Sequence, residues 1–211
     1  MSEAFNFGGE IVWRPTPDYI NSAYLTRFME LHNIPSFEAL LRASTSDVAW
    51  FTDALLHFLD IRFYKPYTQV VDLSQGIAWP RWCVGSKMNI VYNCLDKYIG
   101  TEAEHRLALI SETENGQVCT KTYGEVWRQV NQAANALRSL GLGKGDAIGL
   151  YMPMTCEIVV AMLAIAKIGG IILPLFSGYG AGAIASRLQD AGAKALFTAD
   201  GFYRRRSSQT A

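Results

Sequence analysis

The chain has 211 residues, of which 50% are hydrophobic and 18% charged, and its 19 Lys and Arg residues balance its 19 Asp and Glu residues. This composition excludes an intrinsically disordered chain and is typical of a globular protein with one good core, or one core and a small appendage. Because the formal net charge is zero, there is no electrostatic case for a nucleic-acid partner, and we expect none.

Targeting and membrane segments are not apparent. Residues 1–10 contain no basic segment followed by an apolar run, which predicts that no signal peptide is present. The most apolar stretch, residues 158–176, is interrupted by Lys167, Gly169, Gly170 and Pro174. Such interruptions indicate a buried helix, turn and strand rather than a membrane span. We therefore expect a cytoplasmic protein without a membrane partner.

The cysteines and histidines suggest no metal site. The four cysteines form no C-x-x-C pair: Cys83, Cys94, Cys119 and Cys156. Scattered cysteines predict buried, reduced thiols rather than metal ligands or a disulfide framework. His32, His57 and His105 lie outside any nucleophile motif or H-E-x-x-H spacing. We predict no metal ligand and no catalytic residue in this chain.

The N-terminal region, residues 1–87, is predicted to be a small helical cap. One helix is expected to open at Pro17 and to run to about His32, because proline favours the first turn of a helix. Ser36 and Ser46 are expected to cap two further helices, the second covering residues 48–59. The region also contains these aromatic residues: Trp13, Phe28, Trp50, Phe51, Phe58, Phe63, Tyr64, Trp79 and Trp82. Packing of the cap onto the main domain is favoured for them over a ligand-binding surface.

Residues 88–211 are predicted to form the main domain, which begins with a helix over residues 89–97. A strand at residues 107–110 is followed by a polar turn at 112–116, which predicts a hairpin with residues 118–121. Thr122 and Glu125 fit a capping box. Behind them, apolar residues at helical spacing predict a long helix that Gly141 ends.

An alternation of helices and strands follows and determines the fold class. Three short apolar segments, residues 147–151, 171–175 and 195–198, begin 24 residues apart. Helical patterns precede them, and Thr155 is expected to cap the helix at residues 156–168. Because parallel strands need crossovers of this length, the pattern predicts an α/β fold with a parallel sheet covered by helices. The tail, residues 204–211, is polar and shows no periodicity.

Two glycine-rich turns could bind phosphate. The turn at residues 141–146 joins a helix to a strand, which is the reverse of a phosphate loop, and is interpreted as a tight turn. The turn at residues 177–183 follows a strand and opens a helix. It fits the loose G-x-G-x-x-A form through Gly178, Gly180 and Ala183, and Asp200 lies 22 residues beyond Gly178. A dinucleotide-binding oxidoreductase domain therefore stays open as an alternative.

Several ordered segments together resemble the AMP-forming acyl-CoA synthetases, the AMP-dependent synthetase/ligase family. The segments that carry the resemblance are Thr122-Tyr123-Gly124-Glu125-Val126, Gly143-Lys144-Gly145-Asp146, Tyr151-Met152-Pro153-Met154, residues 161–170 and Phe176-Ser177-Gly178-Tyr179. The closest branch is that of the acetyl-CoA and short-chain acyl-CoA synthetases, whose helical cap is similar to residues 13–96. The resemblance thus covers nearly the whole chain.

This resemblance implies a first part of an adenylating domain, here incomplete, behind an N-terminal cap. Family members use ATP and Mg²⁺ to convert a carboxylate to an acyl-adenylate, whose acyl group then passes to CoA. The family's Ser/Thr/Gly-rich phosphate loop has no counterpart in this sequence, so we expect the chain alone to be inactive. A complementing C-terminal piece is a possible partner, and a non-catalytic CoA-binding or partner-binding remnant is a second alternative.

Two segments are implied to border CoA. In the acetyl-CoA synthetase branch, the turn that matches Phe176, Ser177 and Gly178 borders the nucleotide end of CoA. The arginine-bearing segment after Asp200 does the same, which points to Arg204 and Arg205. A phosphorylated adenosine needs a cationic partner and a close backbone approach, and the two segments supply these.

Overall fold

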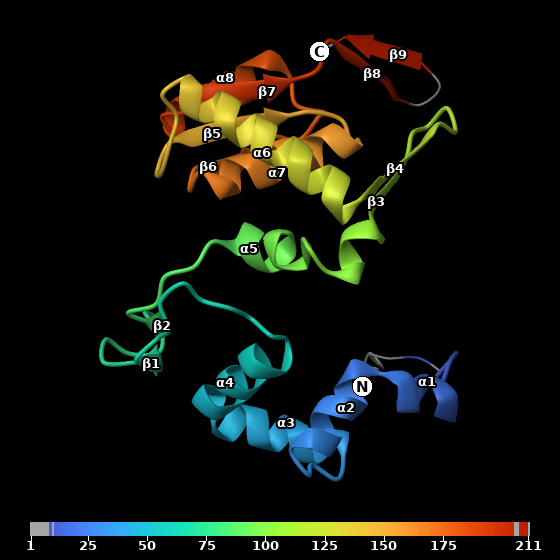
Figure 1. Cartoon of the computed structure of the whole chain (residues 1–211), viewed down its shortest axis with the longest axis vertical. Helices are drawn as coiled ribbons and strands as arrows, with labels where there is room; N and C mark the ends of the chain where they lie inside the picture. Colours follow the sequence, from blue (N-terminus) through green and yellow to red (C-terminus); the bar gives the residue numbers. More distant parts are fainter. Residues whose placement is uncertain (1–8, 10, 205–206, 211) are drawn as a thin grey trace, which may run out of the picture. The chain divides into compact units, whose positions relative to one another are not determined.

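The chain folds into two compact units, which are described separately. The computed structural model describes residues 9, 11–204 and 207–210, with side chains described as far as Gly201 (Figure 1). The helical unit comprises Met1–Ile61 and Tyr67–Gly85, and the sheet unit comprises Arg62–Pro66 and Ser86–Ala211. No helix in the described part of the chain is long and apolar enough to cross a membrane.

The described residues of the helical unit form four short helices and one hairpin. Its elements are α1 (Pro17–Ser22), α2 (Tyr24–Leu31), α3 (Phe37–Ser46), α4 (Val48–Phe58), β1 (Gln69–Asp72) and β2 (Arg81–Val84). Phe28, Leu40 and Ala54 form its buried core. The ring of Phe28 lies edge-on to Phe51 and Phe58, with ring centroids 5.9 and 5.3 Å apart. These aromatic residues therefore pack in the core of the unit itself.

One helix was predicted from Pro17 to about His32, and this prediction is wrong in its extent. The segment forms two helices, α1 and α2, which are divided at Ala23. Ala23 has an extended backbone, with ψ at 140°. The carbonyl of Ile20 accepts hydrogen bonds from the Ala23 N–H at 3.1 Å and from the Thr26 hydroxyl at 2.6 Å. In a continuous helix, the Ile20 carbonyl would accept the N–H of the residue four positions further on. The two bonds described here take its place, and α1 ends.

One further prediction for this unit is wrong, and one of its elements was not predicted. Asp47, not Ser46, caps α4, and its carboxylate accepts a hydrogen bond from the Trp50 N–H at 2.8 Å. Ser46 instead ends α3. The antiparallel β1–β2 hairpin was not predicted, because its strands show no clear alternation of apolar residues. An ion pair between Asp72 and Arg81, which are also register partners, closes this hairpin.

The sheet unit contains the parallel sheet and its helices. Its elements are α5 (Ile90–Cys94), η1 (Asp96–Tyr98), η2 (Glu102–His105), β3 (Leu107–Glu112), β4 (Val118–Thr122), α6 (Tyr123–Ser139), β5 (Ala147–Tyr151), α7 (Cys156–Lys167), β6 (Ile171–Pro174), α8 (Ala181–Asp190), β7 (Ala195–Thr198), β8 (Gly201–Arg204) and β9 (Ser207–Thr210). Strands β3 and β4 pair as the predicted antiparallel hairpin. The predicted capping box of α6 is confirmed at Thr122 and Glu125.

The parallel sheet is confirmed, with the strand order β6-β5-β7. Ile148 and Leu150 of the central strand β5 are buried in one core with residues of α6 and α7. Gly149 faces the other way, where an added Cβ would lie 2.8 Å from Leu188 of α8 and 2.7 Å from Leu196 of β7. Helices thus cover both faces of the sheet, α6 and α7 on one and α8 on the other, and Gly149 lets the backbone of β5 approach α8.

Asn89 fixes the start of α5 to the end of α7. Its side-chain amide donates to the carbonyls of Ala166 at 2.9 Å and Lys167 at 3.2 Å. Lys167 also forms an ion pair of 2.6 Å with Asp96 in η1. The Asn89 amide thus bonds carbonyls in the last turn of α7, of which that of Ala166 also accepts the Gly169 N–H at 3.0 Å.

The tail and the cysteines differ from their predictions. The backbone of residues 201–204 and 207–210 forms the antiparallel pair β8–β9, whereas no regular structure was predicted for the tail. All four cysteines are free thiols. Cys156 is buried as predicted, but Cys94 is exposed and Cys83 and Cys119 are half-buried. Periodicity could not place Cys94, because it is the last residue of a five-residue helix.

Candidate functional site

The carboxyl edge of the parallel sheet is where the fold can hold a ligand. Strand β5 leads into α7 on one face of the sheet, and its neighbour β6 leads into α8 on the other. The loops after β5 and β6 therefore diverge. A divergence of this kind opens a crevice at the ends of adjacent parallel strands, and ligands of open α/β sheets bind in such crevices.

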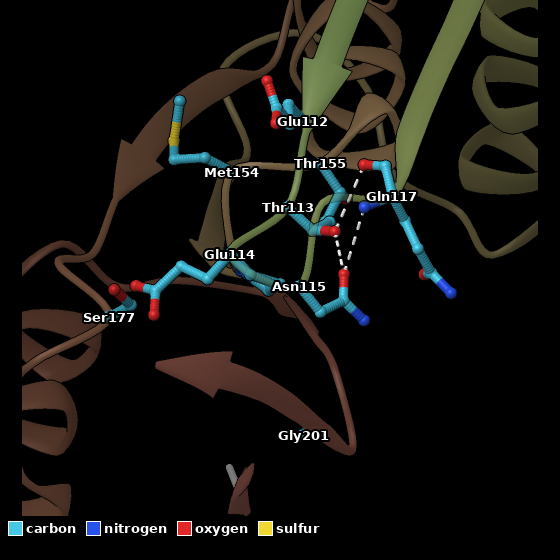
Figure 2. A pocket seen from close by; sticks show the side chains of 10 residues that line it. Glu112, Thr113, Glu114, Asn115, Gln117, Met154, Thr155, Ser177 and Gly201 are labelled. Carbon is cyan, nitrogen blue, oxygen red and sulfur yellow. Dashed lines mark hydrogen bonds between the residues drawn. The ribbon is translucent and has the colours of Figure 1, made fainter. Parts of the chain in front are cut away.

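A cleft of about 390 Å³ lies at this edge (Figure 2). Its lining residues are Glu112, Thr113, Glu114, Asn115, Gln117, Pro153, Met154, Thr155, Ser177 and Gly201. They come from the β3–β4 turn, from the loops after β5 and β6, and from the start of β8. The cleft has the size of a small-molecule pocket.

The β3–β4 turn forms one wall of the cleft and is held by its own hydrogen bonds. The Thr113 hydroxyl donates to the side-chain oxygen of Asn115. That oxygen also accepts the Gln117 N–H at 3.3 Å, and both contacts are visible in Figure 2. The Thr113 N–H donates to the Gln117 carbonyl at 2.9 Å. This network gives the wall a defined shape without help from a ligand.

The N-terminus of α7 forms a second wall. Ser111 of β3 donates its hydroxyl to the carbonyl of Met154 at 3.3 Å, which joins this wall to the hairpin. Thr155 occupies the predicted N-cap position but makes no side-chain capping bond to the backbone. A hydrogen bond from the Thr155 side chain lowers the pKa of Glu157. A carboxylate in the first turn also suits the positive end of the helix dipole.

The loop after β6 forms the third wall and contains three predicted site residues. The Tyr151 hydroxyl donates to the carbonyls of Ser177 at 3.4 Å and Tyr179 at 3.3 Å, which fixes the loop to the end of β5. The Phe176 ring lies edge-on to Tyr179, 5.6 Å away, and is 59% exposed. The guanidinium carbon of Arg187 in α8 lies over the ring of Tyr179, 4.3 Å from the ring centroid. The loop therefore presents an exposed aromatic ring next to Ser177.

The predicted CoA-binding residues are only partly brought together. Ser177 lines the cleft, and Phe176 and Gly178 flank it in the same loop. Arg204 ends β8, whose first residue Gly201 also lines the cleft. The structure describes only the backbone of Arg204, and Arg205 lies outside the described residues.

The acidic hairpin wall was not predicted as part of the site. Glu112 and Glu114 were assigned to a polar turn, and they precede Ser177 by more than 60 residues. The only signal was the polarity of this turn. Among the described residues that line the cleft, none is a lysine or an arginine. The described walls therefore offer hydroxyls, amides and carboxylates.

The other candidate residues lie elsewhere. His32 is packed against Phe28 and Trp50, with ring centroids 4.6 and 5.5 Å away. In the described part of the chain, no group of three or more His, Cys, Asp or Glu residues could hold a metal ion.

The alternative dinucleotide turn has the predicted order of elements. It follows β6, and Gly180 is the N-cap of α8 with a negative φ of −77°. A Cβ at Gly180 or Gly182 would meet no atom within 4 Å, so packing within the protein does not require glycine there. The oxidoreductase interpretation stays a prediction.

Family profiles match the chain in two consecutive segments. The profile described as "AMP-binding enzyme" matches residues 99–211, and the profile of the acetyl-coenzyme A synthetase N-terminus matches residues 37–94. The first match alone covers more than half of the chain and contains every wall of the cleft.

Individual proteins give the same result. The chain is 38% identical to the 3-hydroxypropionyl-coenzyme A synthetase of Sulfurisphaera tokodaii over 82% of its own length and 26% of that protein. It is 37% identical to the acetyl-coenzyme A synthetase of Laribacter hongkongensis over 90% of its length and 29% of that protein. The chain thus spans less than a third of these relatives.

A solved structure extends the likeness to three dimensions. The acetoacetyl-CoA synthetase of Streptomyces lividans superposes with a TM-score of 0.84 at 30% identity, covering 94% of this chain and 31% of that protein. The fold, the two profiles and these relatives agree, and the predicted resemblance is confirmed. The chain belongs to the AMP-binding enzyme family and corresponds to the N-terminal portion of an AMP-forming acyl-CoA synthetase.

Proposed function

We propose that this chain supplies the N-terminal part of an enzyme that joins a short-chain carboxylic acid to CoA, with conversion of ATP to AMP and pyrophosphate and with Mg²⁺ as cofactor. The observation that carries the proposal is the cleft at the carboxyl edge of the sheet, within the segment that matches the AMP-binding enzymes. The short acyl chain is supported by the names of the relatives, which are synthetases of 3-hydroxypropionyl-CoA, acetyl-CoA and acetoacetyl-CoA.

Within this function, we assign the chain a cap at residues 1–87 and the first part of the adenylating domain at residues 88–211. We propose that the cleft binds the nucleotide end of CoA, with Phe176 against the adenine and with Ser177 and Gly178 beside the ribose. Phe176 suits this role because its ring is exposed and held edge-on by Tyr179. Arg204 and Arg205 are proposed to bind the phosphate on the adenosine of CoA, the group that dephospho-CoA lacks. A complementing C-terminal polypeptide would supply the triphosphate-binding residues, so the chain alone should show only background ATP–pyrophosphate exchange.

The proposal is tested by calorimetric titration of the chain with CoA, dephospho-CoA and NAD. We expect CoA to bind more tightly than dephospho-CoA and NAD not to bind. Phe176→Ala should weaken CoA binding about 10-fold, which corresponds to about 1.4 kcal/mol and is typical of a lost stacking contact. Replacing Arg204 and Arg205 by alanine should remove the difference between CoA and dephospho-CoA.

A control is Leu140→Ala, which truncates an apolar side chain that is even more exposed than Phe176 but follows α6, before β5 begins. This variant should bind CoA like the wild type. Equal affinity of the Phe176→Ala variant and the wild type for CoA would contradict the proposed site. Binding of NAD without CoA would instead favour a dinucleotide-binding oxidoreductase domain.

A further inference from the structure

Two cysteines that are distant in the sequence meet behind the wall of the cleft. Cys119 lies on β4 opposite Ser111 of β3, and Cys156 is the first residue of α7. The Cys156 thiol donates to the Cys119 carbonyl with a sulfur–oxygen distance of 3.7 Å. Ser111 bonds to Met154, two residues before Cys156, at 3.3 Å. Since register partners share a face of the hairpin, the side chain of Cys119 lies on the face that meets α7.

The two thiols differ in their access to solvent. Cys156 is only 2% exposed, whereas Cys119 is half-buried. A second cavity of about 430 Å³ reaches both of them, and its lining residues are Ser111, Thr113, Gln117, Val118, Cys119, Thr155, Cys156 and Glu157. A small reagent can therefore reach Cys119 in a cavity that Cys156 also lines.

We propose that Cys119 and Cys156 form a reversible disulfide bond that ties the β3–β4 hairpin to the N-terminus of α7. The oxidant is a low-molecular-weight disulfide of the glutathione type. The Cys119 thiolate attacks one sulfur of this disulfide, releases one glutathione thiol and forms a mixed disulfide. Cys156 then loses its proton and attacks the sulfur of Cys119, which forms the internal bond and releases the second glutathione thiol.

The order of these steps follows from the surroundings of the two sulfurs. Burial, and then the neighbouring thiol of Cys119, raise the pKa of Cys156 to about 11. Cys156 is therefore a poor first nucleophile. Formation of the mixed disulfide removes the ionisable thiol of Cys119, which is one cause of this raised pKa. The second step is thus easier than a direct attack by Cys156 on the oxidant.

The bond would connect two walls of the main cleft. Residues 113–117 of the turn and residues 153–155 before α7 both line that cleft, and the bond would lie between them. It would close a loop across 37 positions of the chain, which contains all of α6 and β5. A covalent loop of this length restricts the unfolded chain and stabilises the fold. The inference rests on the contact between the cysteines and not on the proposed function.

The test is an equilibration of the reduced chain with mixtures of reduced and oxidised glutathione, followed by alkylation and digestion without reduction. At the oxidising end we expect a peptide pair linked through Cys119 and Cys156, which dithiothreitol separates again. The exposed Cys94 should carry glutathione under the same conditions. The thermal midpoint of the oxidised chain should exceed that of the reduced chain by about 5 to 10 °C.

Two variants and a labelling experiment make the result decisive. Cys94→Ser should give the same yield of linked peptide as the wild type, whereas Cys119→Ser should give none and should show no oxidation-dependent rise in midpoint. When isotope-labelled and unlabelled chains are mixed before oxidation, the two peptides of each linked pair should be either both labelled or both unlabelled, because the bond forms within one chain. Wild-type chain that carries glutathione on Cys119 without any linked pair would overturn the proposal, as would linked pairs of mixed label.

Discussion

The pKa of the Tyr67 hydroxyl is raised mainly by one contact within the helical unit. The hydroxyl donates to a carboxylate oxygen of Asp53 at 2.5 Å. This hydrogen bond, followed by burial, raises the pKa of Tyr67 from 10.0 to about 12. Because the folded-state pKa is the higher one, the stabilisation is complete below pH 10 and is lost as the pH rises through about 12.

We therefore expect Tyr67→Phe to lower the free energy of unfolding by about 1 kcal/mol at neutral pH, the typical net value of one hydrogen bond. The difference from the wild type should be constant below pH 10 and should shrink above it. Urea unfolding across this pH range measures the difference, and tyrosinate absorbance follows the titration. Tyr19→Phe, at an exposed tyrosine of the same unit, is the control and should leave the pH dependence intact. A pH-independent difference between wild type and Tyr67→Phe would contradict the assignment.

At the scale of single residues, the sequence predicted what depends on neighbours along the chain. The Thr122–Glu125 capping box was found because both partners lie within one turn of helix. The burial of Cys94 was predicted wrongly, and the acidic wall of the cleft was not predicted, because both depend on contacts between distant segments. Glu112 and Glu114 join Ser177 only through the docking of the hairpin on α7.

Among the elements, α6 begins with the reciprocal bonds of this capping box. The Thr122 hydroxyl accepts the Glu125 N–H at 3.3 Å, and the Glu125 carboxylate accepts the Thr122 N–H at 2.8 Å. The bond from the backbone of Thr122 is the largest cause of the lowered pKa of Glu125. The resulting stabilisation is present above the ordinary pKa of 4.5 and is lost as the pH falls through the lower folded-state value.

Thr122→Ala should destabilise the sheet unit by about 1 kcal/mol, whereas Thr122→Ser should stay close to the wild type, because serine also caps a helix. Urea unfolding at neutral pH gives both values. The cost of Thr122→Ala should be smaller in acid, where Glu125 is protonated in both proteins. Equal losses for alanine and serine would show that the methyl group of Thr122, rather than its hydroxyl, stabilises the helix.

The predicted and unpredicted elements differ in the range of their contacts. Strands β5, β6 and β7 were predicted because each is a short apolar run between helical patterns. The β1–β2 hairpin was missed, since its pairing is completed by an ion pair and not by an apolar pattern. The division of the first helix at Ala23 was also missed, because Ala23 itself favours helix and the cause is the bond from Thr26 to Ile20.

For the molecule as a whole, each unit has a core of its own. Phe28 is 3% exposed in the helical unit, and Ile148 is fully buried in the sheet unit. Phe28→Ala should lower the free energy of unfolding of the helical unit by about 3 to 5 kcal/mol. Ile148→Ala should lower that of the sheet unit by about 2 to 5 kcal/mol. The two variants are controls for one another.

Native-state hydrogen exchange distinguishes the two effects. Phe28→Ala should lower the protection of amides in α2, α3 and α4 and leave α6 and α7 protected. Ile148→Ala should do the opposite, because separate cores permit separate opening. Loss of protection in both units from either substitution would contradict independent cores.

The strand order β6-β5-β7 has a consequence for synthesis on the ribosome. The strand that is made first, β5, lies in the middle, and β6 and β7 add to its two sides. Strands β6 and β7 therefore each pair with a strand that has already been synthesised, and the pairing of neither requires a segment that is still inside the ribosome. Since domains form from the N-terminus during translation, this sheet can grow outward from its centre as the chain emerges.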